Sequence, residues 1–178
     1  MSVYTSITPE QLDDFLTHFR QIGQARDLQG ISQGVENTNY FLTTEQGEYI
    51  LTIFERVPEA DLPFFLNLMA FLAKDSLPVP QPVLDDEGRY LRRLVGKTAA
   101  IVTKLPGRTI YYPGVEHCAE VGRVLGRMHK VGQRFPDARE NPRGPAWWQD
   151  TAAELEGDLS PDEWRLLQDE LTYQYHNR

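Results

Sequence analysis

A short segment near the start of the chain, G-I-S-Q-G-V-E-N-T-N at residues 30–39, combines two glycines with small polar side chains. Gly34 can adopt a positive φ, which lets neighbouring backbone N–H groups face an anion. Short polar donors are added by Ser32, Asn37, Thr38 and Asn39. Together these groups suit the phosphates of a nucleotide that lies under a β-hairpin. An ordinary turn-rich hairpin is the alternative that composition leaves open.

The first five residues of this segment, Gly30 to Gly34, also match the G-x-S-x-G pattern of a hydrolase nucleophile. That pattern places its serine on a sharp turn between a preceding strand and a following helix. Here the apolar pattern predicts a helix before the segment and a strand after it, and no suitable Asp-then-His pair follows. The sequence therefore disfavours a serine hydrolase.

Two further sets of residues could take part in chemistry. The chain has four histidines, which are His18, His117, His129 and His176. None has metal-ligand spacing with cysteine or carboxylates, so we expect no metal site from them. Lys104 follows an apolar stretch and precedes Pro106 and Gly107. Lys104 is either a surface residue at a strand end or part of a hinge between two lobes, where backbone groups could hydrogen-bond an adenine.

Composition narrows the class of protein. The 178 residues carry a formal net charge of −8, which argues against general affinity for nucleic acid or anionic membranes. The single cysteine, Cys118, excludes a disulfide within the chain and fits a reducing compartment. The sequence shows no signal peptide and no apolar run near the roughly 18 residues of a membrane span. We expect a soluble, cytoplasmic protein with no nucleic-acid or membrane partner.

Apolar periodicity predicts the elements that must position these residues. Thr8 is a good N-cap for a helix from Pro9 to about Gly23, and Asp61 is a candidate cap for a second helix. Strands are expected around Phe41 and Leu42, at 49–54, on both sides of a turn at 86–88, and at 98–105. The order helix, two strands, helix, three strands favours an antiparallel sheet with a helix packed on one face.

From about residue 108 the pattern becomes helical. We expect a helix at 115–132 whose inward face carries Cys118, Val121, Leu125 and Met128. A short helix should include Trp147 and Trp148, and a last helix should begin at the capping box of Ser160. The predicted fold class is α+β, with a mixed lobe at residues 1–106 and a helical segment at residues 107–178.

Four segments occur in order along the chain: GVENTNYFLTTEQGEYILTIFE, DLPFFLNLMAFLAKDSLPVPQPV, GKTAAIVTKLPGR and HCAEVGRVLGRMH. Together they resemble the bacterial homoserine kinases of the aminoglycoside-phosphotransferase-like (protein-kinase-like) superfamily, over about residues 1–132. The resemblance implies a nucleotide-binding lobe with a five-stranded antiparallel sheet and one principal helix, followed by part of a helical lobe. It also implies transfer of the γ-phosphoryl group of ATP, with Mg²⁺, to the hydroxyl of L-homoserine in threonine biosynthesis.

The resemblance also implies a nucleotide site. Its residues would be Ile31, Ser32, Gly34, Asn37, Thr38, Asn39, Ile50, Thr52, Thr103, Lys104, Leu105 and Gly107. Thr52 stands where many relatives have a lysine that pairs with phosphates, and no glutamate matches that lysine's usual helix partner. The phosphate charge must then be met by backbone N–H groups, by Mg²⁺ or by a cation elsewhere.

A kinase of this superfamily needs a catalytic loop of the form H-G-D-x-x-x-x-N and a later metal-binding aspartate. His117 and His129 are followed by Cys and Lys instead, so we predict no catalytic residue and no metal ligand in this sequence. We expect the N-terminal portion of a homoserine kinase, inactive by itself, with exposed apolar surface that favours self-association. The alternatives are another small-molecule kinase of the same fold and a non-catalytic nucleotide-binding module.

Overall fold

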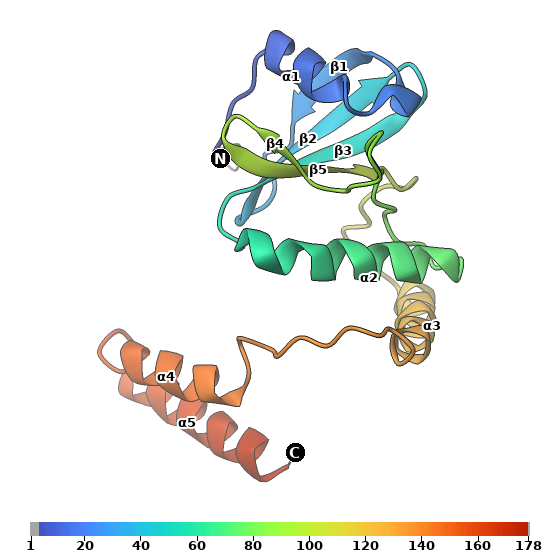
Figure 1. Ribbon diagram of the computed structural model, residues 1–178. Coiled ribbons are helices and arrows are strands. Elements are labelled where there is room, and N and C mark those ends of the chain that lie inside the picture. Colours follow the sequence, from blue (N-terminus) through green and yellow to red (C-terminus); the bar gives the residue numbers. More distant parts are fainter. Residues whose placement is uncertain (1–3, 178) are drawn as a thin grey trace. The chain divides into compact units, whose positions relative to one another are not determined.

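The computed structural model describes residues 4–177 and divides the chain into two compact units (Figure 1). The division falls between Asp137 and Ala138, so the first unit holds the sheet and its helices and the second unit is a helical pair. The lobe boundary expected near Gly107 lies in the extended segment between β5 and α3, and it stays a prediction. No helix among residues 4–177 combines the length and apolarity needed to cross a bilayer.

The first unit is built on a five-stranded antiparallel sheet in the order β1-β2-β3-β5-β4. Its strands are β1 (Ala25–Gly30), β2 (Asn37–Thr44), β3 (Glu48–Phe54), β4 (Arg92–Leu94) and β5 (Lys97–Thr103). A tight turn joins β2 to β3, where Thr44 N donates to Gly47 O over 2.9 Å. Gly47 has φ +155°, which explains why a glycine ends this turn. The predicted fold class, α+β with a five-stranded antiparallel sheet, is confirmed.

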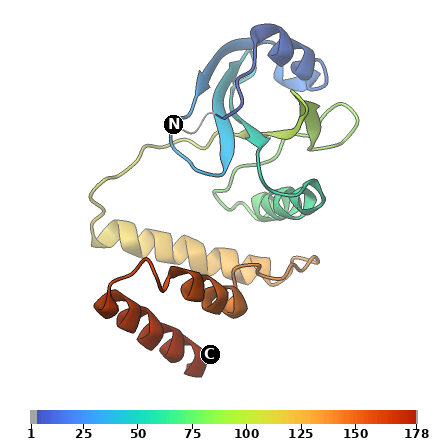
Figure 2. The ribbon, with the colours of Figure 1, turned by 90° about the vertical axis from the view of Figure 1, so that its left-hand side faces the viewer.

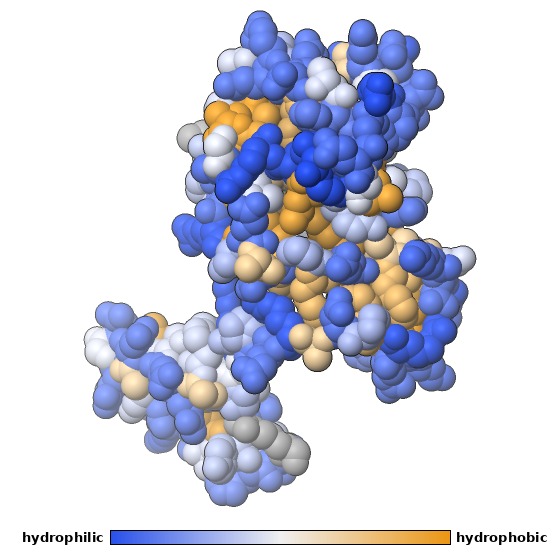
Figure 3. Space-filling view, in the orientation of Figure 1, coloured by the Kyte–Doolittle hydropathy of each residue, from blue (hydrophilic) through white to orange (hydrophobic). Residues whose placement is uncertain are grey.

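Helices lie on the two faces of this sheet (Figures 1 and 2). Helix α1 (Pro9–Leu16) begins at the predicted capping box of Thr8 and Gln11 and buries Leu12, Phe15 and Leu16. These side chains form one core with the alternate residues of the strands, which are Tyr40, Leu42, Leu51, Ile53, Ala99 and Ile101. Helix α2 (Leu62–Lys74) lies on the opposite side of the sheet, and Figure 3 shows apolar surface over it.

The first predicted helix is shorter than expected. Helix α1 ends at Leu16, and a separate 3₁₀-helix η1 covers Arg20–Ile22 before Gly23. Phe19 leaves the helical conformation, with φ −124° and ψ 50°, yet its side chain is fully buried and lies 5.2 Å from the Phe15 ring. Packing of this ring into the core therefore outweighs continuation of the helical pattern.

The predicted order of strands is wrong although their number is right. Three strands precede α2 and two follow it, because β1 forms at Ala25–Gly30 and no strand forms at Val83 and Leu84. The stretch that includes Pro82 and Val83 instead forms an isolated bridge between Pro82 and Val102, and Val83 N donates to Ile101 O over 2.9 Å. Pro82 has no N–H to donate, which favours a bridge over a full strand here.

The cap predicted for α2 is also wrong. A 3₁₀-helix η2 (Glu59–Asp61) runs directly into α2, so Asp61 has helical φ −87° and ψ −21° and makes no side-chain capping bond. An N-cap residue normally has extended geometry, which the 3₁₀ turn prevents here.

Helix α3 (Val115–Gly132) packs on α2 only through its last turns. Val131 and Met128 join a small cluster with Leu72 and Leu77. The prediction that the whole stripe faces inward is wrong, since Cys118, Val121 and Leu125 are exposed. Among residues 4–177, the contact with α2 involves Met128 and Val131 and does not cover Cys118, Val121 and Leu125.

The second unit is a pair of helices, α4 (Pro145–Leu155) and α5 (Pro161–His176). Helix α5 begins at the predicted capping box, where Ser160 and Glu163 hydrogen-bond each other. Trp147 and Trp148 lie on α4 as expected, and Trp147 stays 44% exposed. Ala152 is buried between the helices, which gives the unit a small core.

Candidate functional site

Four of the predicted nucleotide-site residues lie on one face of the sheet. In β2 the core side carries Thr38 and Tyr40, so the pleat places Asn37 and Asn39 on the other side. Register then adds residues of β3 and β5 to this second face through the pairs Asn39↔Thr52, Thr52↔Ala100 and Ile50↔Val102. The result is a polar strip beside an apolar strip on the face that looks toward α2 (Figure 1).

A cross-strand hydrogen bond organises the polar strip. Thr52 Oγ1 donates to Asn39 Oδ1 over 2.8 Å, which fixes the oxygen end of the amide. Asn39 Nδ2 makes a long contact of 3.5 Å with Asn37 O. An amide nitrogen carries two N–H donors, so Asn39 keeps donor capacity on this face.

The loop between β1 and β2, residues 31–36, is called the glycine loop below. Its backbone closes where Ile31 N donates to Asn39 O over 2.9 Å. Gly34 has φ +131°, a conformation that L-residues rarely adopt, and Ser32 is exposed. A Cβ built on Gly34 would stand 3.9 Å from Asn39 Nδ2. The glycine backbone and the Asn39 amide therefore meet at one place, where both could donate to an anion.

Thr38 is the predicted residue that the structure separates from the others. Its side chain is fully buried on the α1 side of the sheet. Its hydroxyl accepts the N–H groups of Tyr4 and Thr5, at 2.9 and 3.1 Å, and donates to Glu55 Oε1 over 2.6 Å. These bonds occupy the hydroxyl with protein partners, so its prediction as a nucleotide ligand has no geometric support.

Sequence reasoning missed the buried carboxylate of Glu55 beside Thr38. Burial raises the pKa of Glu55, but hydrogen bonds from Lys97, Thr38 and Thr5 outweigh burial and hold that pKa below its usual range. Lys97 Nζ forms an ion pair with Glu55 and also donates to Thr5 Oγ1 over 2.8 Å. Nothing local in the sequence signals this group, because its members are 42 and 92 residues apart.

The predicted hinge, Thr103 to Gly107, leaves the same part of the sheet. Thr103 exchanges two 2.9 Å hydrogen bonds with Gln81, one of them through its hydroxyl. Lys104 Nζ forms an ion pair with Glu48 over 2.8 Å and lies 5.5 Å from the centre of the Phe41 ring. Leu105 and Gly107 are exposed, and Gly107 has φ +143°. The Lys104 cation is therefore bound at the rim of the face, while the backbone after it is exposed.

Two polar features limit the chemistry of the site. Asn37 Oδ1 is buried and has no hydrogen-bond partner. An oxygen acceptor does not suit a phosphate, so the oxygen end of Asn37 does not fit that group. Among residues 4–177, no three His, Cys, Asp or Glu side chains gather in a way that could hold a metal ion. The donor set therefore fits phosphate binding through Asn39 and backbone groups.

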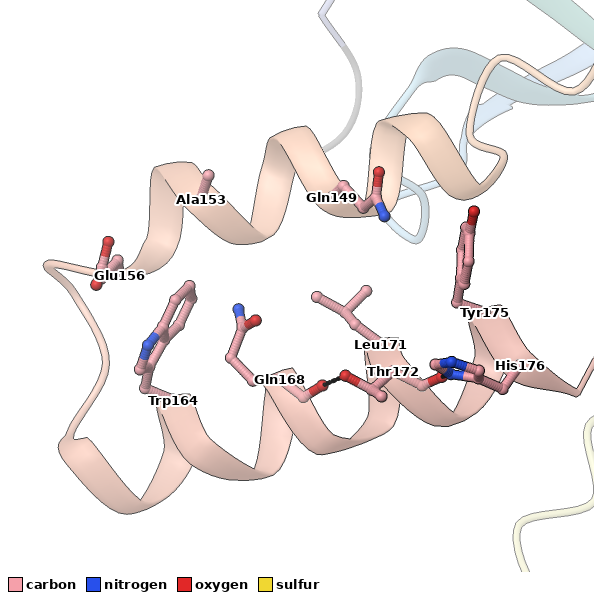
Figure 4. Close-up of a pocket in the computed structure, with 9 residues that line it drawn as sticks. All are labelled: Gln149, Ala153, Glu156, Trp164, Gln168, Leu171, Thr172, Tyr175 and His176. Atoms are coloured by element: carbon pink, nitrogen blue, oxygen red, sulfur yellow. Dashed lines mark hydrogen bonds between the residues drawn. The ribbon is translucent and has the colours of Figure 1, made fainter.

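A separate cavity of about 400 Å³ lies between α4 and α5 (Figure 4). Trp164, Gln168 and Leu171 of α5 point toward α4 across it, and Gln149 and Ala153 of α4 also line it. None of the predicted nucleotide-site residues lines this cavity.

Comparison with known proteins agrees with this fold. Residues 27–176 match the phosphotransferase enzyme family. Homoserine kinase of Cupriavidus pinatubonensis is 45% identical over 178 residues, which cover 98% of this chain and 54% of that protein. The chain thus spans about half the length of the curated relatives it matches.

Two solved structures show the same fold at lower identity. An amicoumacin kinase in complex with AMP-PNP, Ca²⁺ and Ami has a TM-score of 0.61 and 21% identity, over 95% of this chain and 55% of that one. A spectinomycin phosphotransferase in complex with ADP and spectinomycin has a TM-score of 0.59 and 16% identity, over 88% and 48%. The match to the family across most of the chain, together with this shared fold, means that the chain belongs to the phosphotransferase enzyme family.

Proposed function

We propose that the chain supplies the ATP-binding portion of a homoserine kinase, which transfers the γ-phosphoryl group to the hydroxyl of L-homoserine. The observation that carries ATP binding is the placement of Asn39, Thr52 and Ile50 on one sheet face beside the glycine loop. The choice of homoserine rests on the relative from C. pinatubonensis, which is 45% identical along nearly the whole chain.

The chain's own groups would bind and orient the nucleotide. The apolar strip of Ile50 and Val102 offers a flat surface for a base, and the exposed backbone near Leu105 offers hydrogen bonds to its edge. The glycine loop and Asn39 Nδ2 would donate to phosphate oxygens. ATP would supply the transferred phosphoryl group, and its Mg²⁺ would neutralise negative charge that develops during transfer.

We propose no catalytic residue for the chemical step within this sequence. The sequence holds no H-G-D-x-x-x-x-N pattern, and residues 4–177 offer no metal cluster. We therefore propose that this chain alone binds ATP without phosphorylating homoserine. We also propose a cytoplasmic location, supported by the single unpaired Cys118, and self-association through the exposed apolar face of α3.

Isothermal titration calorimetry of the 178-residue chain with ATP and with adenosine tests the binding site. We expect both to bind and ATP to bind more tightly, because only ATP reaches the glycine loop with its phosphates. A chain that is folded by thermal melting but takes up no ATP would refute the proposal.

A fusion tests the acceptor. The part of the C. pinatubonensis homoserine kinase that lies beyond the aligned region would be joined to Arg178, and ATP-dependent phosphorylation would be measured with L-homoserine, an amino alcohol, a sugar and an aminoglycoside. We expect activity with L-homoserine in the fusion and none in the unextended chain. Preference for another acceptor would point to a different small-molecule kinase. A folded, ATP-binding but inactive fusion would favour a non-catalytic nucleotide-binding module.

A further inference from the structure

The segment that precedes α1 is tied to the start of β2, directly after the glycine loop. The N–H groups of Tyr4 and Thr5 both donate to Thr38 Oγ1, at 2.9 and 3.1 Å. Tyr40 adds a third bond from the same strand, because its hydroxyl donates to Thr5 O over 2.6 Å. The backbone at residues 4 and 5 is therefore held against β2 rather than left as a loose end.

A hydrogen-bonded polar group beneath the sheet surface supports this attachment. The hydroxyls of Thr5 and Thr38 each donate to Glu55 Oε1 over 2.6 Å. Lys97 donates to Thr5 Oγ1 and forms an ion pair with Glu55. Thr5 is 9% exposed and Thr38 is fully buried. Buried polar groups that lose their partners are costly, so this group resists opening. Tyr4 thus extends from a rigid support.

From that support, the side chain of Tyr4 reaches the glycine loop. Its hydroxyl donates to Val35 O over 3.2 Å, next to Gly34 with its positive φ. The peptide unit is planar, so holding the carbonyl of Val35 also sets the plane of the peptide that joins Val35 to Glu36. One residue therefore contacts the chain at two points, Val35 within the loop and Thr38 just after it.

We infer that Tyr4 is a positioning residue that holds the glycine loop in shape for the phosphates of ATP. This inference rests on the proposed function, since the loop must face phosphates for its shape to matter. Ordering a loop before the ligand arrives removes part of the conformational entropy that binding otherwise has to overcome. Tyr4 should therefore affect binding of the phosphates and leave binding of the adenine unchanged.

The variant Tyr4→Phe removes only the hydroxyl and keeps the ring. In calorimetry with the 178-residue chain, we expect ATP affinity to fall about threefold to tenfold, the usual size for one hydrogen bond. Adenosine affinity should not change. The matched control is Tyr173→Phe, since Tyr173 is similarly exposed but lies on α5. Unchanged ATP affinity, or equal losses for ATP and adenosine, would overturn the inference.

Hydrogen exchange of the unliganded chain gives a second readout that needs no nucleotide. We expect faster exchange of the backbone amides at residues 33–36 in Tyr4→Phe, with the amides of β3 unchanged. If the unaltered chain binds no ATP, the proposed function fails, while exchange still decides whether Tyr4 orders the loop. Equal exchange in the two proteins would show that the hydroxyl does not hold the loop.

Discussion

The hydroxyl of Thr52 donates a hydrogen bond of 2.8 Å to Asn39 Oδ1, and the two residues are paired in the register of β2 and β3. Thr52 is the position where the resemblance implies that many relatives carry a phosphate-binding lysine. Here the residue orients a neighbouring amide and carries no charge to the ligand.

Replacing Thr52 with alanine should weaken ATP binding by less than about tenfold, because it removes one neutral hydrogen bond that orients Asn39. Calorimetry on the two proteins measures the difference. A loss above about 100-fold, or ~2.7 kcal/mol, would mean that Thr52 acts on the phosphates directly.

The variant Asn39→Asp should weaken ATP binding more than Thr52→Ala does, by at least about tenfold. The carboxylate can still accept the Thr52 bond, but it replaces an N–H donor with a negative oxygen near the phosphates. Adenosine binding should persist. Asn67→Asp, at an exposed position of α2, adds the same charge and is expected to bind ATP normally. Equal effects of the two variants would count against a phosphate contact at Asn39.

Gly34→Ala should lower the free energy of unfolding by about 1 kcal/mol and weaken ATP binding, because alanine is strained at φ +131°. Space is not the obstacle, since the nearest atom to the new Cβ lies at 3.9 Å. Gly122→Ala is the control, because Gly122 lies within α3 with nothing near its Cβ, and alanine should stabilise the helix. Urea unfolding and calorimetry would measure both effects, and a stabilised Gly34→Ala protein would contradict the account.

Glu55→Gln should make the chain's stability less dependent on acid. The folded-state pKa of Glu55 lies below the ordinary 4.5, so its ionised form adds stability above about pH 4.5, and that stability is lost as pH falls through the folded pKa. We expect Glu55→Gln to cost about 1–2 kcal/mol at pH 7 and the gap to close as the pH falls through the lowered pKa of Glu55.

Urea unfolding at several pH values measures this gap. Asp85 also has a lowered pKa, where burial is outweighed by hydrogen bonds from the Arg89 and Glu87 backbones and from Arg92, but it titrates in both proteins and cancels. Glu154→Gln on the exposed surface of α4 should follow the unaltered chain. A gap that stays constant with pH would rule out the ionised form of Glu55 as its source.

Leu125→Glu should reduce self-association of the chain. Leu125 and Val121 are 47% and 66% exposed on α3, and a charge there opposes burial of this face against another copy. Sedimentation velocity over a range of concentrations would report the change. Gln133→Glu, at the exposed C-cap of α3, adds the same charge elsewhere and should associate as before. Monomeric behaviour of the unaltered chain at all concentrations would contradict the proposal.

Features that depend on a few neighbouring residues could be predicted from the sequence. The capping boxes of Thr8 and Ser160 each join residues three positions apart, and both form as expected. The turn that ends at Gly47 and the alternation of β3 are equally local. The sequence by itself therefore determined the starts of α1 and α5, the β2–β3 hairpin and the α+β class.

Only the tertiary structure decided which polar residues share a face. Thr38 and Asn39 are adjacent and drew the same prediction, but the pleat turns them to opposite sides of β2. Thr38 then takes partners 34 and 17 residues away, at Tyr4 and Glu55. The exposure of Val121 was likewise decided by what α3 packs against. Packing and hydrogen bonding between residues far apart in the chain decided the burial of Thr38 and the exposure of Val121. The residues next to Thr38 and Val121 in the sequence do not reveal which distant residues they meet.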